Sequence, residues 1–476
     1  MSETKKGGYI MGVKRDLTQG SIIKGLLWVS IPVLIQSLIN MAYNLTDMFW
    51  VSKVSTMGLS ETDAIAGVGT AGFFLWFGMG LIALIKTGTS IKVSHAVGAK
   101  ELEKVDMYGN TGFTMMIVIA AIYGLIGFFG AKYYANSWGY ESQAVINYTI
   151  DYLRIITIFG ISIYITNSFS AVYNGLGVTV LTLIVTSIGL FVNMILDPFF
   201  ILDQFTLFGM TFNGLGLTVK GAAIATAIAQ GSVLLTYIIL FFTKLRPFHF
   251  KPWAHFNWKA GVRVLSLSWP VAVQSVLFTM IAMIVTRMQS SYGAEIVATQ
   301  RLGSQVEALA WMMALGVQVG VATFVGQNYG AQLFDRIKHG YVSALKMMVP
   351  YGIIIGFVLF FFARQIFGIF TDDPEFLDLG EKYLKILSFS QLFMIIELST
   401  AGVFIGLGKT KYPAIVGVFG NFLRVPMAAL LSIPLGFAGI WWGISLSSVI
   451  KGIVLVMIFA LVFKRMLVQD PIKVEI

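Results

Sequence analysis

A stripe of polar side chains interrupts the first long apolar segment of the chain. Its members are Gln36, Asn40, Tyr43, Asn44 and Asp47. Apart from Tyr43, which lies beside the others, they are spaced by three or four residues and so share one face of a helix. An ionised carboxylate costs roughly 2.5 to 3.5 kcal/mol near the bilayer centre and less toward its edges. We therefore expect this face to meet other protein groups, with Asp47 in a functional site.

A second acidic group occurs in a later apolar segment. Asn193 and Asp197 are four residues apart, and Pro198 follows them and removes one helical hydrogen bond. Thr226 adds a hydroxyl on a small-residue helix face, where close packing is possible. Carboxylate, amide and hydroxyl oxygens suit an alkali cation, and two close carboxylates can instead share a proton. The residue types predict a cation or proton site at Asp47, Asn193, Asp197 and Thr226.

The alternative to a functional site is hydrogen bonding between helices. We favour that alternative for a lone Asn or Thr, but not for the two Asp residues. In the second half of the chain, Glu307 and Glu397 lie near the middle of apolar segments, with Arg287 and Arg301 on neighbouring ones. These acids either form ion pairs or take part in substrate or proton handling, and both interpretations stay open.

The segments that carry these residues are long enough to cross a membrane. Hydrophobic residues make up 57% of the 476 residues and charged residues 12%, and the mean hydropathy is +0.80. Since a crossing takes about 20 helical residues, we expect an all-α polytopic membrane protein of about twelve transmembrane helices. The predicted spans are 25–51, 64–91, 110–134, 146–172, 179–202, 215–243, 264–289, 296–326, 340–366, 383–405, 412–434 and 437–463.

Basic residues indicate how the chain is oriented in the membrane. Lys and Arg concentrate before the first span, after the second, between the sixth and seventh, and after alternate later spans. Because positive residues are retained in the cytoplasm, both termini are predicted to be cytoplasmic in a multi-pass protein of the cell membrane.

The two halves of the chain repeat each other. Three motifs of the first half return in the second: 30–37 at 268–275, 175–177 at 406–408, and 193–198 at 421–426. Their common order predicts two pseudo-symmetric six-helix lobes, residues 1–247 with the cation site and residues 248–476, as in transporters that rock one half against the other. Val425 replaces Asp197 in the repeat, so we expect the lobes to differ chemically.

Several function classes lack their characteristic residues. The absence of cysteine excludes disulfides and thiolate chemistry, and no phosphate-binding loop or cluster of catalytic groups is visible. The net charge of +10 comes from short turns rather than a basic stripe, so no nucleic-acid partner is predicted. We expect no enzyme and no cofactor other than Na⁺ or H⁺ as a coupling ion.

The segments 43–47 and 193–198 resemble the multidrug and toxic compound extrusion (MATE) family, in its prokaryotic branch related to DNA-damage-inducible exporters. The likeness covers nearly the whole chain, including 16–20 and 175–177. It implies a cation site at Asp47, Asn193, Asp197 and Thr226, with Tyr43 and Tyr152 lining it. Together with the polar stripe, Glu307 and Glu397 are predicted to line the substrate cavity.

The resemblance also implies the activity: export of amphipathic, often cationic drugs or metabolites in exchange for Na⁺ or H⁺. We expect the protein to be monomeric. One alternative is a lipid-linked oligosaccharide flippase, which should have a cationic central cavity instead of the acids found here. An ion channel should show a filter motif and short subunits, and a membrane enzyme should show clustered nucleophiles or metal ligands. Neither set of features is visible in the sequence.

The predicted orientation can be tested by cysteine labelling, since the chain has no native cysteine. Asp373 lies in a predicted outer turn and Lys251 in the cytoplasmic connection between the lobes. We expect an impermeant thiol reagent to label Asp373→Cys, but not Lys251→Cys, in intact cells. The opposite labelling pattern would invert the assigned orientation.

Overall fold

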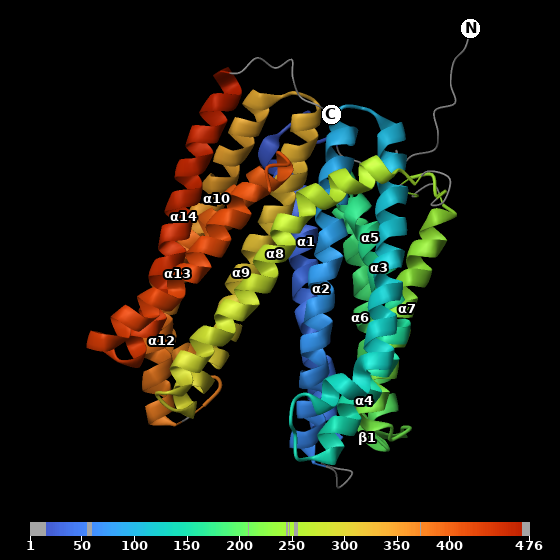
Figure 1. The fold of residues 1–476 in the computed structure, drawn as a ribbon, viewed down its shortest axis with the longest axis vertical. Coiled ribbons are helices and arrows are strands. Elements are labelled where there is room, and N and C mark those ends of the chain that lie inside the picture. Colours follow the sequence, from blue (N-terminus) through green and yellow to red (C-terminus); the bar gives the residue numbers. More distant parts are fainter. Residues whose placement is uncertain are drawn as a thin grey trace. The chain divides into compact units, whose positions relative to one another are not determined.

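The computed structural model describes residues 16–54, 60–207, 209–243, 246, 248–251, 256–371 and 373–468, and within them it is almost entirely helical (Figure 1). The first half comprises α1 (Ile22–Ser52), α2 (Glu61–Gly98), α3 (Leu102–Asn136), α4 (Gln143–Phe159), α5 (Ile161–Leu176), α6 (Thr179–Ile201), β1 (Gln204–Leu207), β2 (Met210–Asn213) and α7 (Thr218–Phe241). The second comprises α8 (Trp258–Ser290), α9 (Ala294–Gly330), α10 (Phe334–Phe361), α11 (Ala363–Phe367), α12 (Pro374–Gly406), α13 (Lys411–Leu435) and α14 (Phe437–Val468).

The helices confirm the expectation of about twelve spans. Within the described residues, 11 helices are long and apolar enough to cross a membrane, and the pair α4 and α5 makes a further, bent span. The two helices of that pair meet at 47° across Gly160. There the Ser162 hydroxyl donates to the carbonyl of Phe159 (2.7 Å) and competes with the helical hydrogen bonds. The single span predicted at 146–172 is therefore broken.

A two-stranded hairpin between α6 and α7 was not expected from the sequence. β1 and β2 pair antiparallel, with Phe205 opposite Phe212, and the two rings stack with their centroids 5.5 Å apart. Phe205 is buried and also contacts the ring of Phe199 on α6. The hairpin lies at the same end of the chain's first compact unit as α4 (Figure 1). Its four-residue strands are too short to produce a recognisable alternating pattern.

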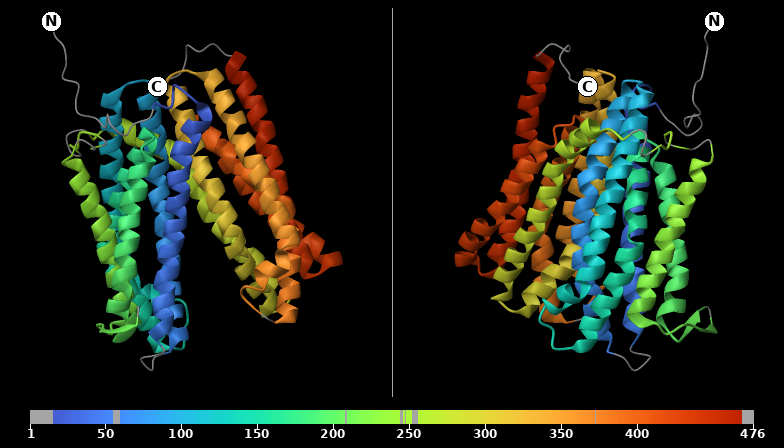
Figure 2. Two further views of the ribbon diagram at one scale, coloured as in Figure 1. Left: turned by 180° about the vertical axis from the view of Figure 1, so that it is seen from behind. Right: turned by 45° about the vertical axis from the view of Figure 1, so that its right-hand side comes forward.

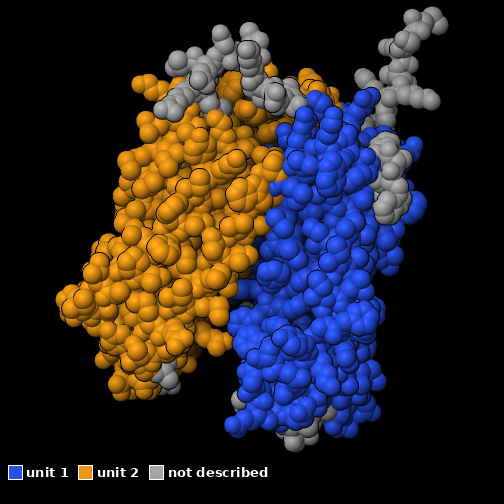
Figure 3. All heavy atoms as spheres, in the orientation of Figure 1, with its two compact units in different colours: residues 1–14, 35–93, 102–265 blue, residues 15–34, 94–101, 266–476 orange. Residues whose placement is uncertain are grey.

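The chain forms two compact units, which Figure 3 colours separately. We call residues 35–93 and 102–265 the first unit, and residues 15–34, 94–101 and the described residues from 266 onward the second unit. The helices α1 and α2 thus each contribute residues to both units. Figure 2 shows the same helices, in blue, from two further sides. The division of the sequence repeat at residue 247 stays a prediction.

The two lobes share backbone details at equivalent positions. Gly177 after α5 and Gly408 after α12 have φ of +77° and +71°, and the next residue of each donates its N–H to a carbonyl five positions earlier. A Cβ added to Gly175 would press on α2 within the first unit, and one added to Gly406 would press on α9 within the second. The repeated Gly-Leu-Gly motif therefore ends a helix and permits close helix packing in both lobes, as the pseudo-symmetric fold predicts.

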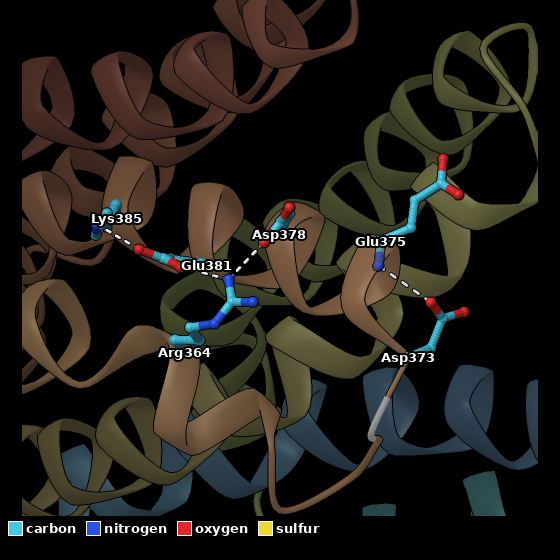
Figure 4. Close-up of polar contacts among 6 residues, drawn as sticks. All are labelled: Arg364, Asp373, Glu375, Asp378, Glu381 and Lys385. Atoms are coloured by element: carbon cyan, nitrogen blue, oxygen red, sulfur yellow. Dashed lines mark hydrogen bonds and ion pairs between the residues drawn. The ribbon is translucent and has the colours of Figure 1, made fainter.

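An exposed ion-pair network lies at the start of α12 (Figure 4). The Arg364 guanidinium contacts Asp378 and Glu381, and Lys385 also pairs with Glu381 (2.6 Å). The carboxylate of Asp373 accepts the backbone N–H of Glu375 (3.0 Å) and caps the helix. Since exposed pairs contribute little stability, this network mainly orients the turn between α11 and α12.

The segment before α1 is fixed to the second unit by hydrogen bonds. The Leu17 side chain is buried, and its carbonyl accepts from Asn328 Nδ2 and from Arg336 Nε, each at 3.2 Å. Arg336 Nη2 also donates to the carbonyls of Gln19 (2.7 Å) and Gly20 (2.9 Å). One arginine therefore binds three backbone carbonyls just before α1, and this segment is anchored on α9 and α10.

This anchoring makes a prediction about stability. Arg336→Ala removes three charge-assisted hydrogen bonds, so we expect it to destabilise the purified protein by about 1 to 3 kcal/mol. Lys338→Ala is the matched control, because Lys338 is exposed on the same helix. Thermal unfolding followed by size-exclusion chromatography would measure the difference, and equal midpoints for the two variants would contradict the anchoring.

Candidate functional site

Three helices of the first unit bring together the residues of the predicted cation site. Asp47 comes from α1, Asn193 and Asp197 from α6, and Thr226 from α7. All four side chains are buried, and Asn193 and Asp197 have no exposed surface. Asn193 Nδ2 donates to Asp197 Oδ1 (2.9 Å), and the Thr226 hydroxyl donates to Asp47 Oδ2 (3.2 Å). The four predicted residues therefore form one compact polar group.

The remaining oxygens of this group lack a hydrogen-bond donor. Asp47 Oδ1, Asn193 Oδ1 and Asp197 Oδ2 are buried and have no hydrogen-bond partner in the part of the chain that the structure describes. The Asp47 carboxyl lies close to both Asp197 and Asn193. Two ionised carboxylates this close repel each other strongly at low dielectric, and a shared proton or a bound cation would relieve that repulsion. Hard oxygen atoms are the ligands that an alkali cation prefers.

Two tyrosines and a glutamine complete the surroundings of the acids. Tyr43 is buried, and its hydroxyl donates to the carbonyl of Thr226 (3.4 Å). Tyr152 of α4 is also buried and lies near Thr226. Gln230, which the sequence interpretation missed, lies near the Tyr43 hydroxyl. Its spacing of four residues from Thr226 on an apolar helix is the signal that could have identified it.

The rest of the polar stripe on α1 does not reach the acids. Gln36 donates to the Thr186 hydroxyl on α6 (3.0 Å), about three helical turns from Asp47. Asn40 has an exposed side chain, and the side chain of Asn44 lies outside the described residues. The polar stripe on this face of α1 therefore contacts more than one group of residues, and only its C-terminal end belongs to the acidic group.

The two predicted acids of the second unit have different partners. Glu307 accepts from the Tyr383 hydroxyl (3.0 Å) and from Gln391 Nε2 (2.7 Å). Glu397 forms a buried ion pair with Lys451 Nζ (3.3 Å). The sequence interpretation named Arg287 and Arg301 as nearby cations, but both are exposed. It missed Lys451, although a lysine inside the apolar run of α14 is itself a signal.

An apolar cluster occupies the position in the second unit that corresponds to the acidic group. Through the repeated motifs, Val285 corresponds to Asp47 and Val425 to Asp197. Val285 is buried with Ile281, Ala428 and Ile440, and Val425 and Ile444 pack against them. These apolar side chains have no oxygen atoms that could bind a cation. The cation chemistry of the acidic group is therefore not duplicated.

Comparison with known proteins shows the family of the chain. The family model described as MatE matches residues 32–199 and 270–430. The chain belongs to the MatE family. It is 27% identical over 437 residues to the probable multidrug resistance protein NorM of Thermotoga maritima, with 89% of each chain covered. It is 20% identical over 465 residues to the multidrug export protein MepA of Staphylococcus saprophyticus, covering 96% of this chain and 98% of that protein.

A solved structure of the same family confirms the fold. An outward-facing multidrug resistance MATE family transporter of the MOP superfamily superimposes with a TM-score of 0.85 at 20% identity, covering 98% of this chain and 99% of the other. The resemblance drawn from residues 43–47 and 193–198 is thereby confirmed. This MatE protein is a multi-pass membrane protein, and because the family consists of transporters, it is not an enzyme.

The three buried oxygens without donors predict a cation effect on stability. Na⁺ added at constant ionic strength should raise the unfolding temperature of the purified protein, since a ligand bound to the folded state stabilises it. Asp197→Asn should reduce this rise at least as much as Thr226→Ala, because losing a full charge costs more than losing one neutral ligand.

The matched control is Asp151→Asn, because Asp151 lies in the same unit but pairs with Lys220 at 3.2 Å and is partly exposed. This variant should keep the full Na⁺ effect. A greater loss in Thr226→Ala than in Asp197→Asn would reverse the ranking of the ligands.

Proposed function

We propose that this MatE family protein is a secondary active multidrug efflux transporter that exchanges amphipathic compounds, many of them cationic, for Na⁺ or H⁺ by alternating access. The observation that carries the proposal is the apposition of Asp47 and Asp197, with oxygens that have no donor. Such a site needs a positive charge. The names of the relatives in Thermotoga and Staphylococcus support multidrug efflux as the transport activity.

Coupling follows from competition for the charge of one carboxylate pair. Na⁺ and H⁺ bind the same oxygens, so either ion neutralises the pair. A bound ion and a bound substrate drive opposite conformations only if each binds one conformation more tightly than the other. We infer that the ion favours the conformation from which substrate leaves, and that substrate favours the conformation in which Asp47 and Asp197 have lost the ion.

The setting of this activity is part of the proposal. The protein acts in the cell membrane as a monomer, with both termini in the cytoplasm, no nucleic-acid partner and no cofactor other than the coupling ion. Lys and Arg in alternate connections support the orientation. The flippase alternative is less well supported, because the buried group of the first unit is acidic rather than basic.

Dye efflux from proteoliposomes tests the coupling. A Na⁺ gradient and a pH gradient, imposed separately, should show which ion drives efflux from vesicles that contain the purified protein. Asp47→Asn should abolish gradient-driven efflux while the protein still inserts, because the carboxylate charge binds the ion. Asp151→Asn should retain efflux. Normal efflux by well-folded Asp47→Asn would refute the proposed ion site.

Substrate release gives an independent check of the competition. Raising Na⁺ concentration or acidity should lower the affinity of the purified protein for a fluorescent substrate, and the effect should vanish in Asp47→Asn. An affinity that stays constant across Na⁺ concentration and pH would leave the two Asp residues as structural groups.

A further inference from the structure

The face of α13 that packs inside the second unit carries an arginine. A Cβ added to Gly420 on this face would collide with the aliphatic stem of Lys451 from α14, and one added to Gly417 would collide with Gln274 from α8. Arg424 follows Gly420 by one helical turn, so it lies on the same face. Its side chain is only partly exposed. The guanidinium is therefore placed among helices α8, α13 and α14.

Within the described residues, the groups that contact this guanidinium directly are all neutral. Arg424 Nε donates to the Ser447 hydroxyl (3.1 Å), and Nη2 donates to the Ser448 hydroxyl (3.2 Å). The ring of Phe278 lies 5.7 Å from the guanidinium carbon. No carboxylate forms an ion pair with Arg424 within the described ranges, and Nη1 donates to no acceptor there. The two serines thus fix the orientation of the group without neutralising it.

The two buried acids of the second unit do not contact Arg424 directly. Glu397 pairs with Lys451 at 3.3 Å, whereas Glu307 accepts from the neutral Tyr383 hydroxyl and Gln391 amide and so keeps its charge. Both carboxylates act on Arg424 from a distance, without a hydrogen bond to it. A guanidinium keeps its charge at every accessible pH, and a partly desolvated charge without a direct counter-ion is costly. An anion bound at Nη1 would offset that cost.

We propose that Arg424 binds an anionic group, most simply a carboxylate, of the transported compound, while the ring of Phe278 contacts its aromatic part. A guanidinium matches the planar geometry of a carboxylate, and Phe278 is 42% exposed and so offers a surface for an aromatic ring. This inference rests on the proposed export function and extends its substrate class to amphipathic zwitterions and anions. The acidic group of the first unit and Arg424 of the second thereby have separate ligands.

A pair of dyes that differ in one carboxylate tests the proposal. Rhodamine B carries a free carboxylate, and its ethyl ester has the same chromophore without that negative charge. We expect Arg424→Gln to weaken rhodamine B binding by about tenfold or more and ester binding by less than about twofold, because only the acid loses a charge-assisted contact. Fluorescence anisotropy on protein in phosphatidylcholine nanodiscs would measure both affinities.

Two further variants separate the charge from the fold. Arg424→Lys should keep part of the preference for the acid, and Arg287→Gln, an exposed arginine of the same unit, should change neither affinity. If Arg424→Gln does not fold, the double substitution Ser447→Ala and Ser448→Ala can be used instead, because it releases the guanidinium from its fixed orientation. This double variant should bind rhodamine B more weakly than the wild-type protein does, with a smaller change for the ethyl ester.

The outcomes that overturn the anion site are distinct from those that refute export. Equal losses for both dyes, no loss for either, or no binding of rhodamine B to the wild-type protein would overturn it. Added phosphatidylglycerol is a further test. If it displaces both dyes to the same extent, and only when Arg424 is present, the ligand of Arg424 is a lipid headgroup and the proposal is overturned. Arg424-dependent binding of rhodamine B without gradient-driven efflux would refute the export mechanism and keep the anion site.

Discussion

The cost of placing charge in a medium without water governs this structure. In hydrocarbon, backbone groups must be satisfied within each helix, and a side-chain charge must find its partner on another helix. Asp47 on α1 meets Asp197 on α6 and Thr226 on α7, and Glu397 on α12 meets Lys451 on α14. Each buried charge therefore indicates which helices pack together. The contacts that satisfy these charges also form the candidate sites.

The repeat shows which features of the two lobes follow from packing and which follow from chemistry. Gly177 and Gly408 keep the same left-handed backbone, and Lys100 and Gln332 adopt positive φ after α2 and α9. These features determine how helices end and approach each other, so both lobes retain them. The residues of the acidic group differ instead, and the valines that correspond to Asp47 and Asp197 belong to an apolar cluster.

The sequence predicted the spans and the acidic group for a physical reason. Apolar length and the cost of a buried acid are properties of one segment, and both can be recognised without knowing its neighbours. The break at Gly160, the hairpin after α6 and the pairing of Glu397 with Lys451 depend instead on contacts between segments. The same limit explains why Gln36 was grouped with Asp47 although it contacts Thr186. Whether the acidic group binds Na⁺, a proton or both stays a prediction.

The unequal lobes have a consequence for the electrical work of transport. The acidic pair of the first unit has an apolar cluster at the corresponding position of the second, so the proposed exchange would use one monovalent ion per cycle. Exchange of that ion for a monovalent cation moves no net charge, so the membrane voltage adds nothing to its driving force. Exchange for a zwitterion moves one positive charge inward, and each 100 mV then contributes about 2.3 kcal/mol. A compound's own charge thus determines how much of the cell's energy can be used to expel it.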